Sequence, residues 1–305
     1  MRLGVLDVGS NTIHLQVMDA HPGARPTPAT NFKVELRLTE HLDSDGAISA
    51  TGISLLNQAI ADAVVHAHES HSDEILAFAT SALRDAKNGS EIIAEINRKH
   101  GIDLQVLNGN DEASMTFLAV RRWFGWSAGK LLVLDIGGGS LEIASGVDES
   151  PDAALSLPLG ASRLTYQYLN GDPYSTKTIK VLQKYVAESL KNALPETLKA
   201  HDADHFAATS KTFRTLARIT SHWNGDNPMY LNKSSLKSAV ERLTTMTKKT
   251  RTELPGVSEI RAGQIVAGAI VAHEVMDRLG ITEVEICPWA LREGILLRRL
   301  DWLSA

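Results

Sequence analysis

LGVLDVG at residues 3–9 and LLVLDIG at residues 131–137 are two copies of one pattern in this chain. Each copy is followed by a polar or glycine-rich turn, GSNT (9–12) and GGGS (137–140), and then by alternating apolar residues. This order predicts a strand, a tight turn and a second, antiparallel strand in each copy. Because the repeat spans strand and loop together, it indicates an internally duplicated fold.

An aspartate stands near the end of each predicted buried strand, Asp7 in the first copy and Asp135 in the second, two residues before a glycine. Glycines let backbone N–H groups approach an anion closely, and a carboxylate can hold the cation that neutralises the anion. Two such loops facing each other would clamp a phosphate chain and its metal. The alternative interpretation is a pair of ordinary hairpins with Asp-Gly turns.

Length and composition indicate a two-domain globular protein of the cytoplasm. The chain has 305 residues, of which 43% are hydrophobic and 22% charged, as in soluble proteins. No apolar run is long enough to cross a bilayer, no signal peptide is visible, and the lone Cys287 excludes an intrachain disulfide. The net charge of −5 argues against broad binding of nucleic acid.

Strand-like and helix-like segments alternate along both halves, which predicts α/β domains. The WSAGK segment (126–130) directly precedes the second repeat, so we expect an N-terminal domain at 1–126 and a C-terminal domain at 127–305. The segment 21–30, rich in proline and small residues, is expected to be a loop. In the second half, apolar periodicity predicts helices near 176–193, 212–222, 234–252 and 259–279, and a closing helix near 290–302.

The segment DIGGGSLE (135–142) is the strongest local signal for chemistry. Three consecutive glycines weaken a strand and so favour a functional explanation. Glu142 shares its facing with Ser140 by the period-2 alternation of a strand. Asp135 and Glu142 could therefore flank one divalent cation, for which magnesium is suited. The alternative for Glu142 is an exposed strand residue.

Six motifs in order carry a family resemblance: DVGSNT (7–12), TSALRDAKN (80–88), NGNDEA (108–113), DIGGGSLE (135–142), LPLGASRLT (157–165) and ATSKTFRTLA (208–217). With CPWALREGIL (287–296), the chain resembles the exopolyphosphatase/guanosine pentaphosphatase (Ppx/GppA) family over nearly its whole length. That family is a branch of the sugar kinase, Hsp70 and actin superfamily. The resemblance implies two duplicated actin-like (ribonuclease H-like) domains with an inter-domain cleft.

The resemblance also implies a reaction, the hydrolysis of the terminal phosphate of inorganic polyphosphate with release of orthophosphate. The family's catalytic base matches Glu112, in the turn that opens a helix, while we interpret the neighbouring Asp111 as an N-cap. The expected cofactor is Mg²⁺ (or Mn²⁺), held by Asp135 and Glu142 with Asp7 as a further candidate carboxylate.

The phosphate-binding residues that the resemblance implies lie in three loops and one helix junction. They are Gly9, Ser10, Asn11, Arg84, Gly137, Gly138, Gly139, Ser140, Ser210, Lys211 and Thr212. Many relatives have glycine where this chain has Lys211, which could add a phosphate contact or narrow the site. Arg163 is either a substrate contact or a partner in an inter-strand salt bridge.

Three other functions stay open. Guanosine pentaphosphate, a substrate linked to the stringent response, would undergo the same 5′-phosphohydrolase chemistry. A kinase of the same superfamily would need adenosine and acceptor sites, and a non-catalytic sensor would only bind polyphosphate or the alarmone. Longer relatives carry extra C-terminal helical domains, whereas this chain ends at Ala305. We therefore expect a preference for short polyphosphate with weak processivity, no nucleic-acid or membrane partner, and a homodimer as in many members.

Overall fold

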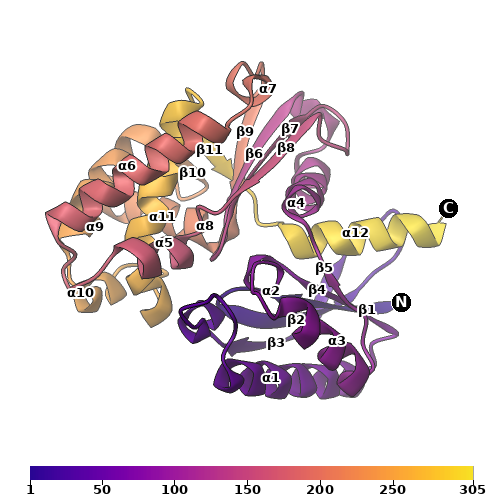
Figure 1. Cartoon of the computed structure of the whole chain (residues 1–305). Coiled ribbons are helices and arrows are strands. Elements are labelled where there is room, and N and C mark those ends of the chain that lie inside the picture. The colour runs from indigo at the N-terminus through magenta and orange to yellow at the C-terminus, as the bar shows by residue number, and fades with distance from the viewer. Residues whose placement is uncertain (305) are drawn as a thin grey trace. The chain divides into compact units, whose positions relative to one another are not determined.

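The computed structural model describes residues 1–304, and these form two compact units. Unit 1 comprises Met1–Met115 together with the C-terminal segment from Leu291 onward. Unit 2 comprises Thr116–Ala290. Each unit contains one β-sheet with its own helices (Figure 1).

Unit 1 is built on a five-stranded sheet in the order β3-β2-β1-β4-β5. The first three strands pair antiparallel, and β1, β4 and β5 run parallel. The strands are β1 (Arg2–Val8), β2 (Thr12–Asp19), β3 (Thr27–Glu35), β4 (Glu74–Ala79) and β5 (Leu104–Val106). The register pairs Leu6 with Leu15 and Val8 with Ile13, which confirms the first predicted hairpin.

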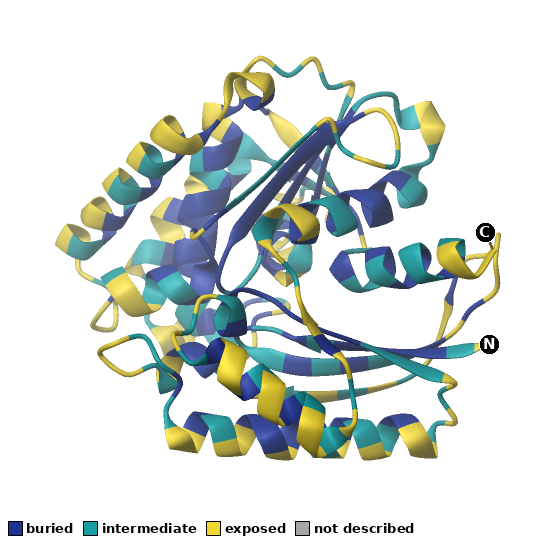
Figure 2. Cartoon of the chain, turned by 45° about the vertical axis from the view of Figure 1, so that its right-hand side comes forward, coloured by how far each residue is buried: buried dark blue, intermediate teal, exposed yellow. Residues whose placement is uncertain are grey.

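Helices cover both faces of this sheet. Helices α1 (Ala50–Glu69) and α3 (Gly89–His100) bury their apolar sides against one face (Figure 2). On the other face, α12 (Leu291–Ser304) places Leu291, Leu296 and Leu300 against Leu3 and Val5. The remaining helical segments of this part are η1 (Leu38–His41) and α2 (Ser81–Arg84), and α4 (Gly109–Phe124) begins in unit 1.

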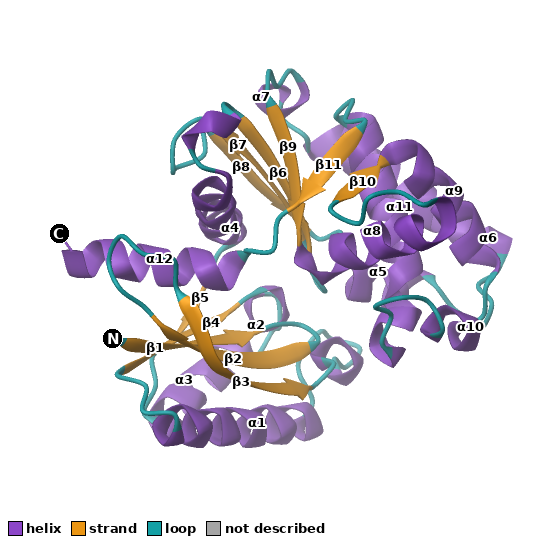
Figure 3. Ribbon diagram, turned by 180° about the vertical axis from the view of Figure 1, so that it is seen from behind, coloured by secondary structure: helices purple, strands orange, loops and turns teal. Residues whose placement is uncertain are grey.

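Unit 2 repeats the same strand order within a six-stranded sheet, β10-β11-β9-β6-β7-β8 (Figure 3). Its strands are β6 (Leu131–Ile136), β7 (Leu141–Gly146), β8 (Ala153–Leu157), β9 (His205–Thr209), β10 (Tyr230–Asn232) and β11 (Glu283–Ile286). The antiparallel set β6, β7, β8 corresponds to β1, β2, β3, and the parallel partner β9 corresponds to β4. The predicted duplication is therefore confirmed.

The helices of unit 2 pack around α11 (Glu259–Arg278), which is buried along most of its length from Ala262 to Met276. The others are η2 (Trp126–Ala128), α5 (Ala161–Tyr168), α6 (Thr176–Ala193), α7 (Glu196–Lys199), α8 (Ser210–Asn224), α9 (Lys233–Thr245) and α10 (Lys248–Thr252). The helices expected near 176–193, 212–222 and 259–279 are thus confirmed.

Two local predictions were wrong. The expected loop 21–30 contains the start of β3, an edge strand whose Pro28 lies near its beginning, where the missing N–H is tolerated. The helix expected over 234–252 is two helices, because the Thr247 side chain accepts a hydrogen bond from the Thr250 amide and starts α10 anew. Arg163, the candidate substrate contact or salt-bridge partner, lies on the helix α5, which begins directly after Gly160.

The division into units differs from the expected ranges 1–126 and 127–305 at two places. Residues 116–126 group with unit 2, where the buried Arg121 donates hydrogen bonds to the carbonyls of Gly129 and Gly146. Helix α12 groups with unit 1, because its leucines complete the core on the β1 face. Within residues 1–304, no helix is both long and apolar enough to cross a membrane.

Candidate functional site

Three carbonyl groups of the glycine loop 137–140, those of Gly137, Gly138 and Gly139, are directed at the start of α5. The Gly137 oxygen accepts a hydrogen bond from the Ala161 amide at 3.0 Å, and the Gly138 oxygen accepts from the amides of Ser162 and Arg163. The Gly139 oxygen accepts from Nε of Arg163 at 2.8 Å. The first amides of α5, which would otherwise lack partners, are therefore used to hold the loop.

This arrangement fixes the direction of the loop amides. In a planar trans peptide, the N–H group points opposite to the carbonyl of the preceding residue. Because three successive carbonyls turn towards α5, the N–H groups of Gly138, Gly139 and Ser140 turn away from it. Successive backbone N–H groups on one side of a loop form a concave anion-binding arrangement.

Gly160 makes this close packing sterically possible. A Cβ atom at position 160 would lie 2.2 Å from the Gly139 carbonyl carbon, 2.3 Å from the Ser140 nitrogen and 2.4 Å from the Gly138 oxygen. All three neighbours are backbone atoms, which cannot move aside without moving the loop. Sequence reasoning did not include Gly160 among the site residues, although it stands directly after a predicted strand in LPLGAS.

The first loop, 9–12, has the same construction in unit 1. The Gly9 amide donates to the Thr12 oxygen at 3.1 Å, as the Gly137 amide donates to the Ser140 oxygen at 2.9 Å. The Ser10 and Asn11 oxygens accept hydrogen bonds from the segment that follows β3. The Ser10 hydroxyl is buried and shares a hydrogen bond of 3.0 Å with the Ser81 hydroxyl, which ties the loop to the start of α2.

Two carboxylates lie opposite each other beside the second loop. Asp135 on β6 is the register partner of Glu142 on β7, and directly opposed residues of an antiparallel pair project from the same face. Glu142 is 3% exposed and accepts a hydrogen bond from the Ser156 hydroxyl at 2.8 Å. No group of three His, Cys, Asp or Glu side chains that could hold a metal occurs among residues 1–304. The carboxylate pair therefore suits a hard cation that keeps several of its waters.

Asp7, the third candidate metal carboxylate, has a different environment. It forms an ion pair of 3.3 Å with Arg292 of α12, which also donates to the Gln16 side chain. Its register partner is His14, at the position that Glu142 occupies in the other hairpin. In the first hairpin the aspartate therefore lies beside the cation of Arg292. In the second hairpin the aspartate lies opposite a second carboxylate, that of Glu142.

Glu112, the candidate base, is 9% exposed in the first turn of α4. Nη1 of Arg84 donates to its Oε2 at 3.0 Å and to the Leu107 oxygen at 3.2 Å. Burial lowers the pKa of Arg84, but the carboxylates of Glu112 and Asp85 outweigh burial and raise it above its usual value. The charge-assisted bond therefore holds the Glu112 carboxylate in one orientation.

The start of α4 is capped by Asn108 rather than by Asp111. Oδ1 of Asn108 accepts a hydrogen bond from the Asp111 amide at 2.9 Å, and its Nδ2 donates to the Asp111 carboxylate at 2.7 Å. This reciprocal pair resembles a capping box. Asp111 is exposed and belongs to the helix cap, which leaves Glu112 as the buried acid of this turn.

The loop at the start of α8 contains a strained residue. Ser210 has φ = 83°, a left-handed conformation that non-glycine residues rarely adopt. Thr212 is buried and Lys211 is exposed. The preceding Thr209 hydroxyl is within hydrogen-bonding distance of the carbonyls of Cys287 and Trp289, which holds the strand end in place. Backbone strain that tertiary contacts maintain is typical of functional loops.

Arg261, in the first turn of α11, is a further cation near this loop that sequence reasoning missed. Burial and the neighbouring Arg214 lower the pKa of Arg261 to about 10. Arg214 in turn donates from Nε to the Ser210 oxygen at 3.1 Å. Two arginines close together are favourable when an anion lies between them. No short motif identifies Arg261, because its partner lies 47 positions earlier in the chain.

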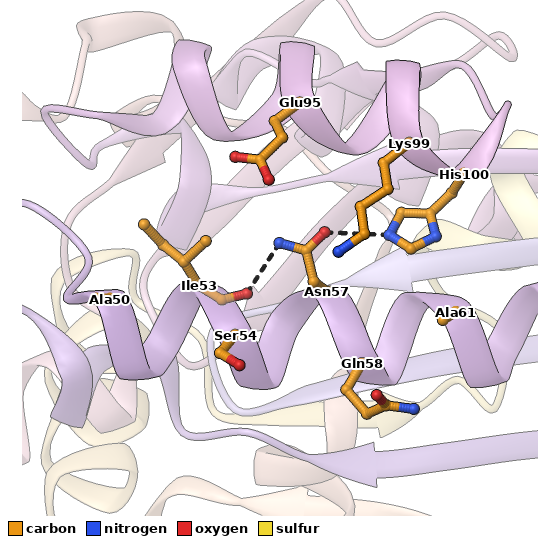
Figure 4. A pocket seen from close by; sticks show the side chains of 9 residues that line it. All are labelled: Ala50, Ile53, Ser54, Asn57, Gln58, Ala61, Glu95, Lys99 and His100. Atoms are coloured by element: carbon orange, nitrogen blue, oxygen red, sulfur yellow. Dashed lines mark hydrogen bonds between the residues drawn. The ribbon is translucent and has the colours of Figure 1, made fainter.

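A cavity of about 480 Å³ lies elsewhere in unit 1, between α1 and α3 (Figure 4). Asn57 and His100 share a hydrogen bond of 3.1 Å at its edge, and Glu95 and Lys99 lie along α3. None of the predicted site residues lines this cavity. It is therefore separate from the glycine loops.

A duplicated α/β fold with a glycine loop in each unit, opposed carboxylates and an ion-paired glutamate defines a phosphate-handling protein of the actin-like class. The model of the Ppx/GppA phosphatase family matches residues 16–302. The chain therefore belongs to the Ppx/GppA phosphatase family.

Relatives and solved structures agree with this family. The chain is 50% identical to a Mycobacterium tuberculosis protein named Exopolyphosphatase 1, over 99% of this chain and 89% of the relative. A Mycobacterium leprae protein of the same name is 48% identical, over 99% and 90%. The crystal structure of an exopolyphosphatase from Cytophaga hutchinsonii is similar with a TM-score of 0.87 and 25% identity, covering 99% of this chain and 98% of that chain.

Gly160→Ala should displace the glycine loop and abolish its anion binding. The added Cβ would overlap backbone atoms, so we expect the affinity for tripolyphosphate to fall by about a hundredfold or more. Calorimetric binding of tripolyphosphate, with circular dichroism to verify folding, measures the effect. In Gly137→Ala the new Cβ would lie 3.6 Å from the Ser140 oxygen, an ordinary contact distance, so this variant should keep the thermal stability of the wild type. Unchanged tripolyphosphate binding by a folded Gly160→Ala protein would contradict the assignment of the loop.

Arg261→Met should stabilise the ligand-free protein at neutral pH and weaken its response to anions. The folded state lowers the pKa of Arg261 to about 10, so the unfolded chain binds this proton more tightly than the folded protein does. The resulting loss in the free energy of unfolding is fully present below pH 10. We expect the free energy of unfolding to rise by about 1–2 kcal/mol in this variant, as measured by chemical unfolding. Tripolyphosphate should raise Tm less in this variant than in the wild type. Arg278→Met, an exposed site on the same helix, is the matched control and should show neither change.

Proposed function

We propose that this protein is an exopolyphosphatase, which hydrolyses the terminal phosphoanhydride of inorganic polyphosphate and releases orthophosphate. The observation that carries the proposal is the set of three loop amides directed to one side of residues 138–140, because successive N–H groups suit successive phosphate oxygens. The mycobacterial relatives, which are 50% and 48% identical to this chain over nearly its whole length, are named exopolyphosphatases. These names support the same substrate.

Unit 2 supplies most of the groups that would bind the phosphate chain. The amides of the 137–140 loop and the hydroxyl of Ser140 bind one part of the chain. The Ser210–Thr212 segment, at the start of a 15-residue helix, adds N–H groups at the positive end of the helix dipole. Lys211 is exposed beside it and adds positive charge. Loop 9–12 of unit 1 has the same backbone construction.

Unit 1 supplies the group that would act on water. Phosphoryl transfer depends more on in-line positioning and on charge stabilisation than on covalent chemistry. Glu112, held at 3.0 Å by Arg84, would accept a hydrogen bond from the attacking water and take its proton. Nε of Arg84 donates to Asp85, and Nη1 donates to Glu112 and Leu107, so Nη2 is the nitrogen of its planar fork that suits a phosphate oxygen.

Family membership implies a divalent metal ion, and the residues present fit Mg²⁺ or Mn²⁺. Asp135 and Glu142 would hold it, with water completing the shell. When bound, such an ion neutralises charge on the phosphate oxygens. Asp7 is a weaker candidate, because Arg292 already forms an ion pair with it.

Glu112→Gln should abolish phosphate release while substrate binding is retained. The substitution removes the proton acceptor but keeps the size of the side chain, so we expect kcat to fall by about a thousandfold or more. The measurement is orthophosphate release with magnesium from short polyphosphate, long polyphosphate and guanosine pentaphosphate, for wild type and variant in parallel. Full activity of the variant would rule out the role of Glu112.

The same experiment separates the alternatives. Faster turnover of guanosine pentaphosphate than of polyphosphate would assign the pentaphosphatase activity instead. Binding of all substrates by the wild type without any release would indicate a sensor. Rapid processive digestion of long polymer would contradict a preference for short chains.

Metal removal should stop the reaction, and the carboxylates should contribute unequally. Asp135→Asn and Glu142→Gln should each raise the magnesium concentration for half-maximal activity by about tenfold or more. Asp7→Asn should change it less, because Asp7 pairs with Arg292. Binding of Mn²⁺ followed by electron paramagnetic resonance gives a readout that does not depend on turnover. An equal loss of Mn²⁺ binding in all three variants would contradict the unequal roles.

A further inference from the structure

Helix α11 contacts the supports of both phosphate loops in unit 2. It is buried along most of its length and lies between α5, which holds the 137–140 loop, and the start of α8, which carries residues 210–212. Neither loop belongs to α11 itself. A rigid element that contacts two binding loops can determine the distance between them.

Gln264 connects α11 to the first of these loops. Its Nε2 donates a hydrogen bond of 3.1 Å to the Ser162 hydroxyl, and the Ser162 amide donates at 2.9 Å to the Gly138 oxygen. Ser162 is only 6% exposed, so this contact is shielded from competing water. One residue of α5 thus separates Gln264 from the backbone of the glycine loop.

Gly268, one turn further along the same face, contacts both supports at once. A Cβ atom at this position would lie 2.6 Å from Cγ2 of Thr212 and 3.5 Å from Cβ of Ala161. Thr212 belongs to the second loop, and the Ala161 amide donates to the Gly137 oxygen of the first. Glycine weakens a helix interior, so its presence here is explained by the close approach that it permits.

We propose that Gly268 and Gln264 are positioning residues through which α11 fixes the separation of the two phosphate loops of unit 2. This separation then matches the spacing between phosphates of one polyphosphate chain. This inference rests on the proposed function for the identity of the ligand. It adds a source of selectivity between ligands. The affinity for a ligand that spans both loops depends on their separation, whereas the affinity for a single phosphate does not.

The test compares a ligand of three phosphates with a ligand of one. Gly268→Ala should push Thr212 away from α5 and weaken tripolyphosphate binding by about tenfold. Orthophosphate, which needs only one loop, should bind as it does to the wild type. Both constants are measured by calorimetry with magnesium in the Glu112→Gln background, so that no substrate is consumed. Gly263→Ala is the matched control, because a Cβ there meets nothing within 4 Å in the same helix.

A second substitution provides a rescue. Thr212→Ser removes Cγ2, the atom that the new Cβ would meet, and keeps the hydroxyl. Tripolyphosphate binding by the Gly268→Ala/Thr212→Ser double variant should therefore approach that of Thr212→Ser alone. If Gly268→Ala does not fold, Gln264→Met decides the question: it removes the bond to Ser162 at similar volume and should weaken tripolyphosphate but not orthophosphate.

Three results would overturn the inference: equal behaviour of Gly268→Ala and Gly263→Ala, equal loss of both ligands, or no rescue by Thr212→Ser. Failure of the proposed function is distinguishable from these. If the variants weaken tripolyphosphate binding selectively but the wild-type protein releases no orthophosphate, the enzyme activity is refuted and the role of α11 is left intact. A wild-type protein that binds no tripolyphosphate would refute both.

Discussion

The contact between Gly160 and the glycine loop is the constraint on which the proposed phosphate site of unit 2 depends. A helix N-terminus normally offers its free amides to an anion, but in α5 the first amides bind the carbonyls of Gly137 and Gly138, and Nε of Arg163 binds the Gly139 carbonyl. The loop amides are turned outward as a consequence of peptide planarity. The binding groups are therefore oriented before any ligand arrives, which reduces the ordering cost of binding.

The duplication provides two similar loops, and single side chains make them different. Both hairpins have an aspartate as the last but one residue of their first strand and close with the same amide-to-carbonyl bond. In the second hairpin Glu142 opposes Asp135, whereas in the first His14 opposes Asp7 and Arg292 forms an ion pair with it. Two carboxylates favour a cation and an arginine opposes one, so the same backbone supports different chemistry in each unit.

Local patterns in the sequence were sufficient to predict the architecture. The repeated strand-loop-strand segments, the helix 259–279 and the α/β class all depend on periodicity and turn residues within short windows. The predicted pairing of Asp135 with Glu142 followed from strand alternation in the same way. The helix over 234–252 failed because periodicity continues through Thr247, while the side-chain cap that restarts the helix is a contact of individual atoms.

What the sequence could not predict depends on contacts between distant segments. Gly160, Arg261 and Gly268 are ordinary residues in their local context, and each acquires a role from atoms that lie 20 to 107 positions away. Helix α12 likewise has an apolar side that would suit either sheet, and only its packing on Leu3 and Val5 assigns it to unit 1. A glycine directly after a strand, or within a buried helix, is the one sequence signal for such close contacts. Its partner is identified only by the folded chain, because close approach of two backbones is a property of the pair.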